Sequence, residues 1–126
     1  MKKLYLLLSV LFLIYWGCDD PKEEDTTSTE VTLWGVVYSV EDTDSLYLPY
    51  SGLTGEIPPE IGDLTNLTYL RLSANQLTGE IPESICDLTL NFNDYHFDIS
   101  NNQLCPPYPN CIHQNDFNNQ DTSNCP

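Results

Sequence analysis

Hydrophobic and polar positions alternate over short stretches of this chain, and the pattern recurs with a long period. When the sequence is shifted by 24 residues, 12 of the 20 positions in 46–65 are identical to those in 70–89. A third, degraded copy follows after a shift of 27, where Phe97 and Ile99 occupy the equivalent apolar positions. A repeat of this length is one supersecondary unit that must stack on its neighbours to bury its apolar side.

Each copy predicts the same path of the chain. The Leu-x-Leu pattern places two leucines on one side of a short strand. Asn75 and Asn102 follow at the bend, where asparagine tolerates tight-turn geometry and its amide can bond backbone groups of neighbouring coils. Apolar residues then return to the same interior, while Gly79 and Pro82 prevent a long helix. We therefore expect one strand and one extended or 3₁₀ back wall per coil.

The segment 64–88 resembles a leucine-rich repeat of the 24-residue plant-type class, and 46–64 is the preceding copy. The motif matches at Leu64, Leu67, Leu70, Leu72, Asn75, Leu77, Gly79, Ile81 and Pro82. The hexad Leu-Thr-Gly-Glu-Ile-Pro occurs twice at the expected spacing. The first copy departs at Ser51, which replaces the bend asparagine, and at Pro49, which lies inside the expected strand and is typical of an edge.

The predicted fold class is an α/β solenoid. The resemblance implies a short right-handed leucine-rich repeat superhelix with a parallel sheet on the concave face and a 3₁₀ or extended convex side. The ends of so short a stack must be closed. We interpret 31–45 as an N-terminal cap in which Trp34 and Tyr38 pack on the first coil, with an exposed ligand site at Trp34 as the alternative. Repeats cover 46–104.

The period breaks at a three-residue insertion in 89–96, and 105–126 is predicted to be a Cys-rich C-terminal cap. Four cysteines lie in or near it, and in a secreted chain they indicate two disulfides with three possible connectivities. Cys86 and Cys111 occupy nearly equivalent places in successive coils, which stack about 4.8 Å apart. We therefore favour Cys86–Cys111 and Cys105–Cys125. A zinc site is the alternative, but the C-x₅-C spacing is outside the usual range for zinc ligands.

The N-terminus indicates an export address. Two lysines precede an apolar run at 4–16 that is too short to span a bilayer, so 1–17 is interpreted as a signal peptide. Gly17-Cys18 resembles the lipobox of bacterial lipoproteins, which implies acylation of the Cys18 sulfur, although Tyr15 and Trp16 depart from the usual pattern. An uncleaved anchor with a free Cys18 is the alternative.

Residues 18–30 are acidic and rich in Thr and Ser, and they are predicted to form a lipid-anchored tether. An acidic stretch at this place also resembles the surface-export signals of Bacteroidetes-type lipoproteins. The predicted location is therefore extracytoplasmic, on a lipid anchor in the bacterial cell envelope, with surface exposure left open. Without the anchor the chain would be secreted.

Composition excludes several classes of function. The chain has 19 Asp+Glu against 4 Lys+Arg and a formal charge of −15, which excludes ordinary nucleic-acid binding and a polybasic membrane patch. No nucleophile elbow, Walker A loop, H-E-x-x-H or EF-hand motif occurs. A Ca²⁺ loop at 41–44 is less favoured than a solvated turn. The N-glycosylation acceptor pattern at 66–68 has meaning only in a eukaryotic secretory pathway. We expect no catalysis, no cofactor and no metal.

The resemblance implies that outward strand positions form a concave binding face. On this chain they are Tyr47, Pro49, Tyr50, Tyr69, Arg71, Ser73, His96, Asp98 and Ser100. Tyr47 and Tyr69 are expected to flank each other, and aromatics and Arg are the residues that anchor interfaces. The alternative for Arg71 is a pairing with Asp98 or Tyr47 across the sheet.

The predicted function is a monomeric, non-enzymatic, extracytoplasmic module that binds a protein or peptide through this face. One alternative is a structural or adhesion lipoprotein that self-associates through the ends of the stack. A second alternative is a glycan-binding module that uses the tyrosines.

Overall fold

The computed structural model describes residues 29–92 and 95–126. The predicted signal peptide, the lipidation site Cys18 and all but the last two residues of the predicted tether lie outside the described residues. Within the described part, no helix is long and apolar enough to cross a membrane.

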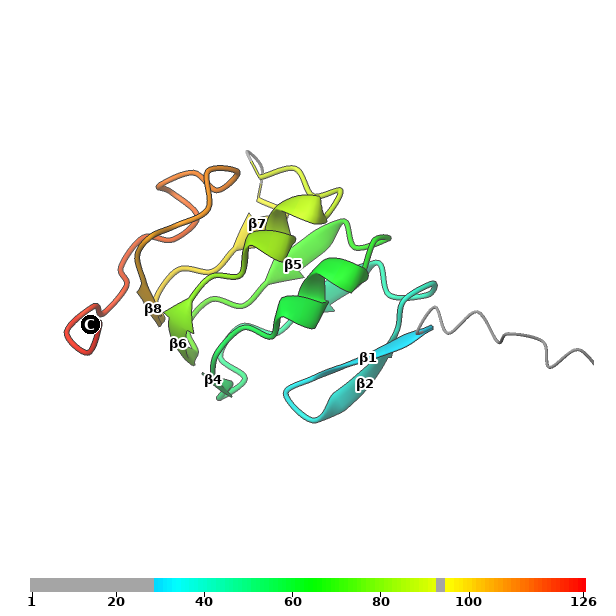
Figure 1. Cartoon of the computed structure of the whole chain (residues 1–126), viewed down its shortest axis with the longest axis horizontal. Coiled ribbons are helices and arrows are strands. Elements are labelled where there is room, and N and C mark those ends of the chain that lie inside the picture. The colour runs from blue at the N-terminus through cyan, green and yellow to red at the C-terminus, as the bar shows by residue number, and fades with distance from the viewer. Residues whose placement is uncertain (1–28, 93–94) are drawn as a thin grey trace, which may run out of the picture.

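Three coils of the chain lie side by side between an N-terminal hairpin and a C-terminal segment (Figure 1). The hairpin is antiparallel and consists of β1 (Glu30–Leu33) and β2 (Val36–Ser39). One strand from each coil enters a first parallel sheet, in the order β3 (Ser45–Tyr47), β5 (Tyr69–Arg71) and β7 (Phe97–Asp98). A second parallel sheet contains β4 (Thr54–Gly55), β6 (Gln76–Glu80) and β8 (Gln103–Cys105). The first two coils are completed by the 3₁₀ helices η1 (Pro59–Asp63) and η2 (Glu83–Asp87).

The strands pair in the register of the repeat. Leu46 lies opposite Leu70, and Leu70 lies opposite Phe97, as shifts of 24 and 27 residues require. The repeat solenoid is therefore confirmed as the architecture. One detail of the expected α/β class needs correction, because the described residues contain no α-helix. The 3₁₀ or extended back wall is present, and its extended segments also pair with one another in the second sheet. Coils in register bring these extended segments level, so their backbone groups can hydrogen-bond to one another.

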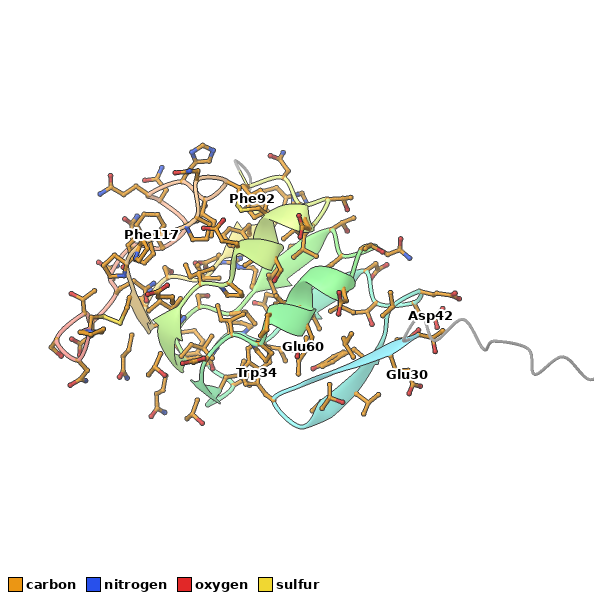
Figure 2. The ribbon with its side chains drawn as sticks, in the orientation of Figure 1. Glu30, Trp34, Asp42, Glu60, Phe92 and Phe117 are labelled. Carbon is orange, nitrogen blue, oxygen red and sulfur yellow. A yellow bond between two sulfur atoms is a disulfide. The ribbon has the colours of Figure 1, made fainter. Side chains whose placement is uncertain are left out.

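The interior between the two sheets is apolar and continuous through all three coils (Figure 2). The strand leucines Leu70 and Leu72 are fully buried, and so is Leu77 after the bend. Ile81 and Ile85 follow on the back wall and are buried against the same cluster. The alternation within the strand and the apolar return therefore fill one core, which no single coil could form alone.

The bends are tied together by the two asparagines predicted for this role. The amide of Asn75 accepts the Ser51 N–H at 2.9 Å and donates to the Leu48 oxygen at 2.8 Å, both in the preceding coil. Asn102 is buried; its amide accepts the Leu77 N–H at 3.1 Å and donates to Leu72 O at 3.0 Å. Each amide thus satisfies backbone groups that the turn leaves without a ladder partner.

The C-terminal segment continues this arrangement as a fourth row. Gln120 accepts the Leu104 N–H at 3.0 Å and donates to the Ile99 oxygen at 3.0 Å, the role that Asn102 plays one coil earlier. Beside it, the Ile99 N–H donates to the Asp116 oxygen at 3.0 Å. The chain that directly follows β7 is therefore hydrogen-bonded to the backbone of the C-terminal segment, which lies beside this end of the sheet.

Two disulfides fasten this end of the stack. The structure joins Cys86 to Cys111 and Cys105 to Cys125, with Cα–Cα distances of 5.7 and 5.6 Å. This is the connectivity that the positions of the cysteines favour. The first bond links η2 to the C-terminal segment, and the second links β8 to the last residues of the chain.

The hairpin closes the other end. Val31 and Leu33 on β1 are buried in the common core, and Trp34 and Tyr38 pack against it from outside. The Trp34 indole Nε1 donates to the Glu56 oxygen of the first coil at 3.2 Å. This contact agrees with a packing role for Trp34.

The first coil differs from the others where its sequence does. β3 ends at Tyr47, so Pro49 lies outside the strand instead of inside it as expected. Proline has no N–H to donate to a ladder, and β3 is one of the two edge strands of its sheet. Ser51 makes no amide bridge of its own; its N–H is held by Asn75 from the next coil.

Candidate functional site

The outer face of the β3–β5–β7 sheet brings together side chains from all three coils. Tyr47 lies level with Arg71, and Arg71 lies level with Asp98. Ser45 is level with Tyr69, so Tyr47 and Tyr69 are diagonal neighbours and not a directly opposed pair. The pairing follows the 24-residue shift, whereas these two tyrosines are 22 residues apart.

Four aromatic rings form a continuous row across this face, which we call the tyrosine row: Tyr47, Tyr69, His96 and Tyr95. The rings of Tyr47 and Tyr69 have centroids 6.0 Å apart. Tyr69 meets His96 edge to face at 5.5 Å, and Tyr95 lies over His96 at 4.2 Å. The row therefore spans the whole width of the sheet.

The two rings at the ends of the row are its most accessible members. Tyr47 is 62% exposed and Tyr95 is 70% exposed. Large aromatic side chains with this exposure are the kind that anchor interfaces, because they bring much apolar area at a low cost in conformational entropy.

Arg71 is held by the protein. Its Nη2 donates to Asp98 Oδ2 at 2.8 Å, the cross-sheet pairing that the sequence analysis left open. The hydrogen bond from Arg71 to Asp98 is the main cause that raises the pKa of Arg71, and a hydrogen bond with Tyr69 adds to it. Burial opposes the charge on Asp98, yet hydrogen bonds from Ser100 and Arg71 outweigh it and lower the pKa of that carboxyl. Arg71 and Asp98 therefore neutralise each other on the face.

Three of the predicted face residues have other roles. Ser73 is buried, and its hydroxyl contributes to lowering the pKa of Asp98. Tyr50 lies at the bend with φ 54°, level with Ala74 and Asn101 in the later coils, where φ is also positive. Its ring is 85% exposed and extends the accessible aromatic surface beyond the strand. Pro49 is partly buried after the end of β3.

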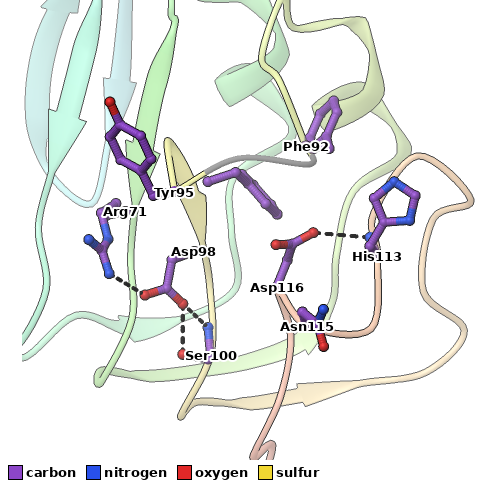
Figure 3. Close-up of a pocket in the computed structure, with 9 residues that line it drawn as sticks. Arg71, Phe92, Tyr95, Asp98, Ser100, His113, Asn115 and Asp116 are labelled. Carbon is purple, nitrogen blue, oxygen red and sulfur yellow. Dashed lines mark hydrogen bonds and ion pairs between the residues drawn. The ribbon is translucent and has the colours of Figure 1, made fainter.

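A hollow of about 660 Å³ lies where the row reaches the C-terminal segment (Figure 3). It is lined by Arg71, Phe92, Tyr95, Phe97, Asp98, Ser100, His113, Asn115 and Asp116. Figure 3 shows Asp98 turned toward Arg71 and Asp116 on the neighbouring C-terminal segment. Aromatic rings and carboxylates therefore border the same space.

Asp116 is the carboxylate of this hollow that has no ion pair in the described part of the chain. Its Oδ2 accepts the His113 backbone N–H at 3.1 Å. Burial is the main cause that raises the pKa of Asp116; repulsion from Asp98 adds to it, while the N–H and the ring of His113 oppose it. A positive charge placed in the hollow would favour the ionised form of Asp116 and so act against both causes of the raised pKa.

Sequence reasoning missed Tyr95, Phe92 and Asp116 as residues of this site. Tyr95 and Phe92 belong to the insertion that interrupts the period, and Asp116 follows the last recognisable repeat. The available signal was the insertion itself, because an extra loop beside a strand end is a common place for binding residues.

The described residues of this site can bind a ligand through aromatic contacts and electrostatic interactions. Among the described residues no group of three or more His, Cys, Asp or Glu could hold a metal ion. The four cysteines of this region are engaged in disulfides, and Arg71 is engaged by Asp98. What the face offers a ligand is an aromatic row, a hollow at its end and a carboxylate.

A family model described as Leucine Rich Repeat matches residues 66–88, which include β5, β6 and η2. No curated protein matches the chain. The chain therefore carries a leucine-rich repeat within a disulfide-bonded repeat solenoid. Leucine-rich repeats typically mediate protein–protein interactions and are usually not enzymes.

Proposed function

We propose that this protein is a non-enzymatic, extracytoplasmic binding module that captures a protein partner on the outer face of the β3–β5–β7 sheet. The observation that supports the proposal is the tyrosine row, whose end residues Tyr47 and Tyr95 are largely exposed and whose rings span all three strands. Exposed rings of this size contribute little to the packing of the core, whereas a role as anchors of a binding interface accounts for their exposure.

The first prediction concerns this face. The double variant Tyr47→Ala/Tyr95→Ala should lose partner capture by about tenfold or more, because hot-spot aromatics each contribute at least about 1–2 kcal/mol of binding. Both rings are exposed, so the free energy of unfolding should change by less than about 1 kcal/mol. Capture is measured by affinity purification of the full chain from the envelope of cells that make it.

The matched control is Val36→Ala/Val37→Ala, which removes two exposed apolar side chains from β2, in the hairpin sheet that is separate from the β3–β5–β7 sheet. It should retain capture. If the tyrosine variant captures the same partners as the unsubstituted chain, the sheet face is not the binding surface and the proposal fails.

We also propose that the coils belong to the 24-residue plant-type class, wind as a right-handed superhelix and remain monomeric. The twice-repeated Leu-Thr-Gly-Glu-Ile-Pro hexad supports the class. The hairpin at one end and the fourth row at the other support the monomer, because both cover surfaces through which coils could stack on a second copy.

The proposed location is the cell envelope, on a lipid attached to Cys18. The support is the sequence around Gly17-Cys18 and the fact that the other four cysteines pair with one another. Cys18 is thus left over from an odd count, which in an exported chain calls for another use of the thiol.

The intact mass of the protein extracted from membranes tests the proposed lipid attachment at Cys18. A diacyl or triacyl modification at Cys18 is expected, with a gain of about four hydrogens when two disulfides are reduced. The variant Cys18→Ala should leave the membrane fraction. An unmodified N-terminus at another residue would contradict the anchor, while free thiols at the other cysteines would contradict the pairing.

A further inference from the structure

We propose that the partner presents an extended, arginine-bearing peptide segment, and that one arginine side chain enters the hollow between Tyr95 and Asp116. The inference rests on the proposed function and names the kind of partner that this face fits. It is carried by three features of the molecule: the aromatic row, the hollow at its end and the charge balance around both.

The excess of acidic over basic residues favours a positively charged ligand on this face. The described residues contain thirteen Asp and Glu but a single Lys or Arg, namely Arg71. That one guanidinium is bound to Asp98 at 2.8 Å. An acidic partner would therefore find no uncommitted lysine or arginine in the described part, whereas a basic one would be attracted by the field of the whole chain.

The hollow has the right groups for a guanidinium. An arginine side chain stacks its planar head on aromatic rings and pairs with carboxylates in a fork geometry. Tyr95, 70% exposed, stands on one side of this space, and Asp116 stands on the C-terminal side. A guanidinium there would stabilise the charged carboxylate of Asp116, which burial and the charge of Asp98 disfavour.

The row favours a peptide over a sugar. Sugar rings bind on open, flat aromatic faces, but Tyr69 meets His96 edge to face and Tyr95 covers His96 at 4.2 Å. The rings thus cover part of one another's faces. An extended peptide can follow such a row and place successive side chains across three strands.

The test uses two synthetic peptides that differ only in charge. One carries three arginines separated by Gly-Ser pairs, and its twin carries citrulline, the uncharged isostere, in their place. Binding to the full chain in non-ionic detergent at 150 mM salt is measured by fluorescence anisotropy. The arginine peptide should bind at least about tenfold more tightly, since each charged contact with a carboxylate or ring contributes a few-fold.

Matched variants locate the contact. Asp116→Asn keeps an acceptor for the His113 N–H, so the fold is retained, and it should weaken the arginine peptide about threefold or more. Glu83→Gln removes the same charge from an exposed position on η2, which contributes no residue to the lining of the hollow, and should change binding by less than about 1.5-fold. Tyr95→Ala should weaken binding to a similar extent as Asp116→Asn.

Three results would overturn the inference. They are equal affinity for both peptides, equal effects of Asp116→Asn and Glu83→Gln, or tight binding of maltohexaose or chitohexaose that is lost in Tyr47→Ala/Tyr95→Ala. If the tyrosine double variant still loses its native partner while the peptides show no preference, the proposed function stands and the arginine inference falls. If that variant keeps its native partner, the proposed function itself fails.

Discussion

Asn102→Ala is expected to destabilise the fold by about 3 kcal/mol, although Asn102 is not part of the tyrosine row. The Asn102 side chain is 3% exposed. Its amide accepts the Leu77 N–H and donates to the oxygens of Leu72 and Ile99. A shift in the unfolding midpoint of about 10 °C or more should follow for a folded region of this size.

Most of the expected loss of stability comes from one backbone group. The Leu72 oxygen still receives Asn75 Nδ2, and the Ile99 oxygen still receives Gln120 Nε2. The Leu77 N–H has no such substitute and would be left buried without an acceptor, which costs about 1–3 kcal/mol in addition to the small cavity.

Two further variants make this test specific. Asn75→Ala removes bonds of the same kind but at a less buried bend, so its effect should be smaller. Asn124→Ala changes an exposed asparagine near the C-terminus and should stay within about 0.5 kcal/mol of the unsubstituted chain. Chemical denaturation measures the free energy of unfolding of the three variants and shows which loses most stability. An Asn102→Ala chain as stable as Asn124→Ala would show that the ladder does not hold the coils.

Loss of the two disulfides is expected to have the largest effect of all, about 3 kcal/mol for each bond by loop-closure entropy. The bonds span 25 and 20 residues of sequence. Together they approach the whole stability of an ordinary small domain, which is about 5–15 kcal/mol. The double variants Cys86→Ala/Cys111→Ala and Cys105→Ala/Cys125→Ala separate the two contributions.

The loss should begin at the C-terminal end of the stack. The N–H groups of Ile99 and Asn101 donate to the oxygens of Asp116 and Asn118, so they should lose protection from hydrogen exchange first. The Leu70 N–H, which donates to the His96 oxygen between β5 and β7, should stay protected longer. Uniform loss of protection throughout the described coils, or no change on reduction, would contradict this role of the disulfides.

Spacing in the sequence was enough to predict the coils and their register. Leu46, Leu70 and Phe97 are aligned by the same shifts in sequence and in space. Asn75 and Asn102 could be assigned to the bends because an amide at a turn has few other uses. The cysteine pairing followed from the same stacking, since Cys86 and Cys111 are separated by nearly one period.

Periodicity gave no information where the chain stops repeating. Gln120 takes the role of a bend asparagine from a segment with no recognisable repeat, so only its position in space identifies it. Tyr95 belongs to an insertion, and its contact with His96 depends on how that loop returns to β7. Ser73 has the right spacing for an outward residue but is buried.

The acidic composition was enough to exclude some classes of partner, but it was not enough to propose a particular class. A low count of lysine and arginine argues against nucleic acid at once. The positive conclusion, a preference for a basic segment, needed the distance between Arg71 and Asp98, because that ion pair decides whether the one guanidinium of the described part is available.

Site-specific photo-crosslinking tests the central claim most directly. A benzophenone amino acid is placed at Tyr47 on the sheet face or at Glu83 on η2, in the full chain made by its own host, and the cells are irradiated. A partner on the outer face of the β3–β5–β7 sheet predicts a crosslinked protein from position 47 and none from position 83. Crosslinks from position 83 alone, or equal yields from both positions, would contradict a binding surface on the tyrosine row.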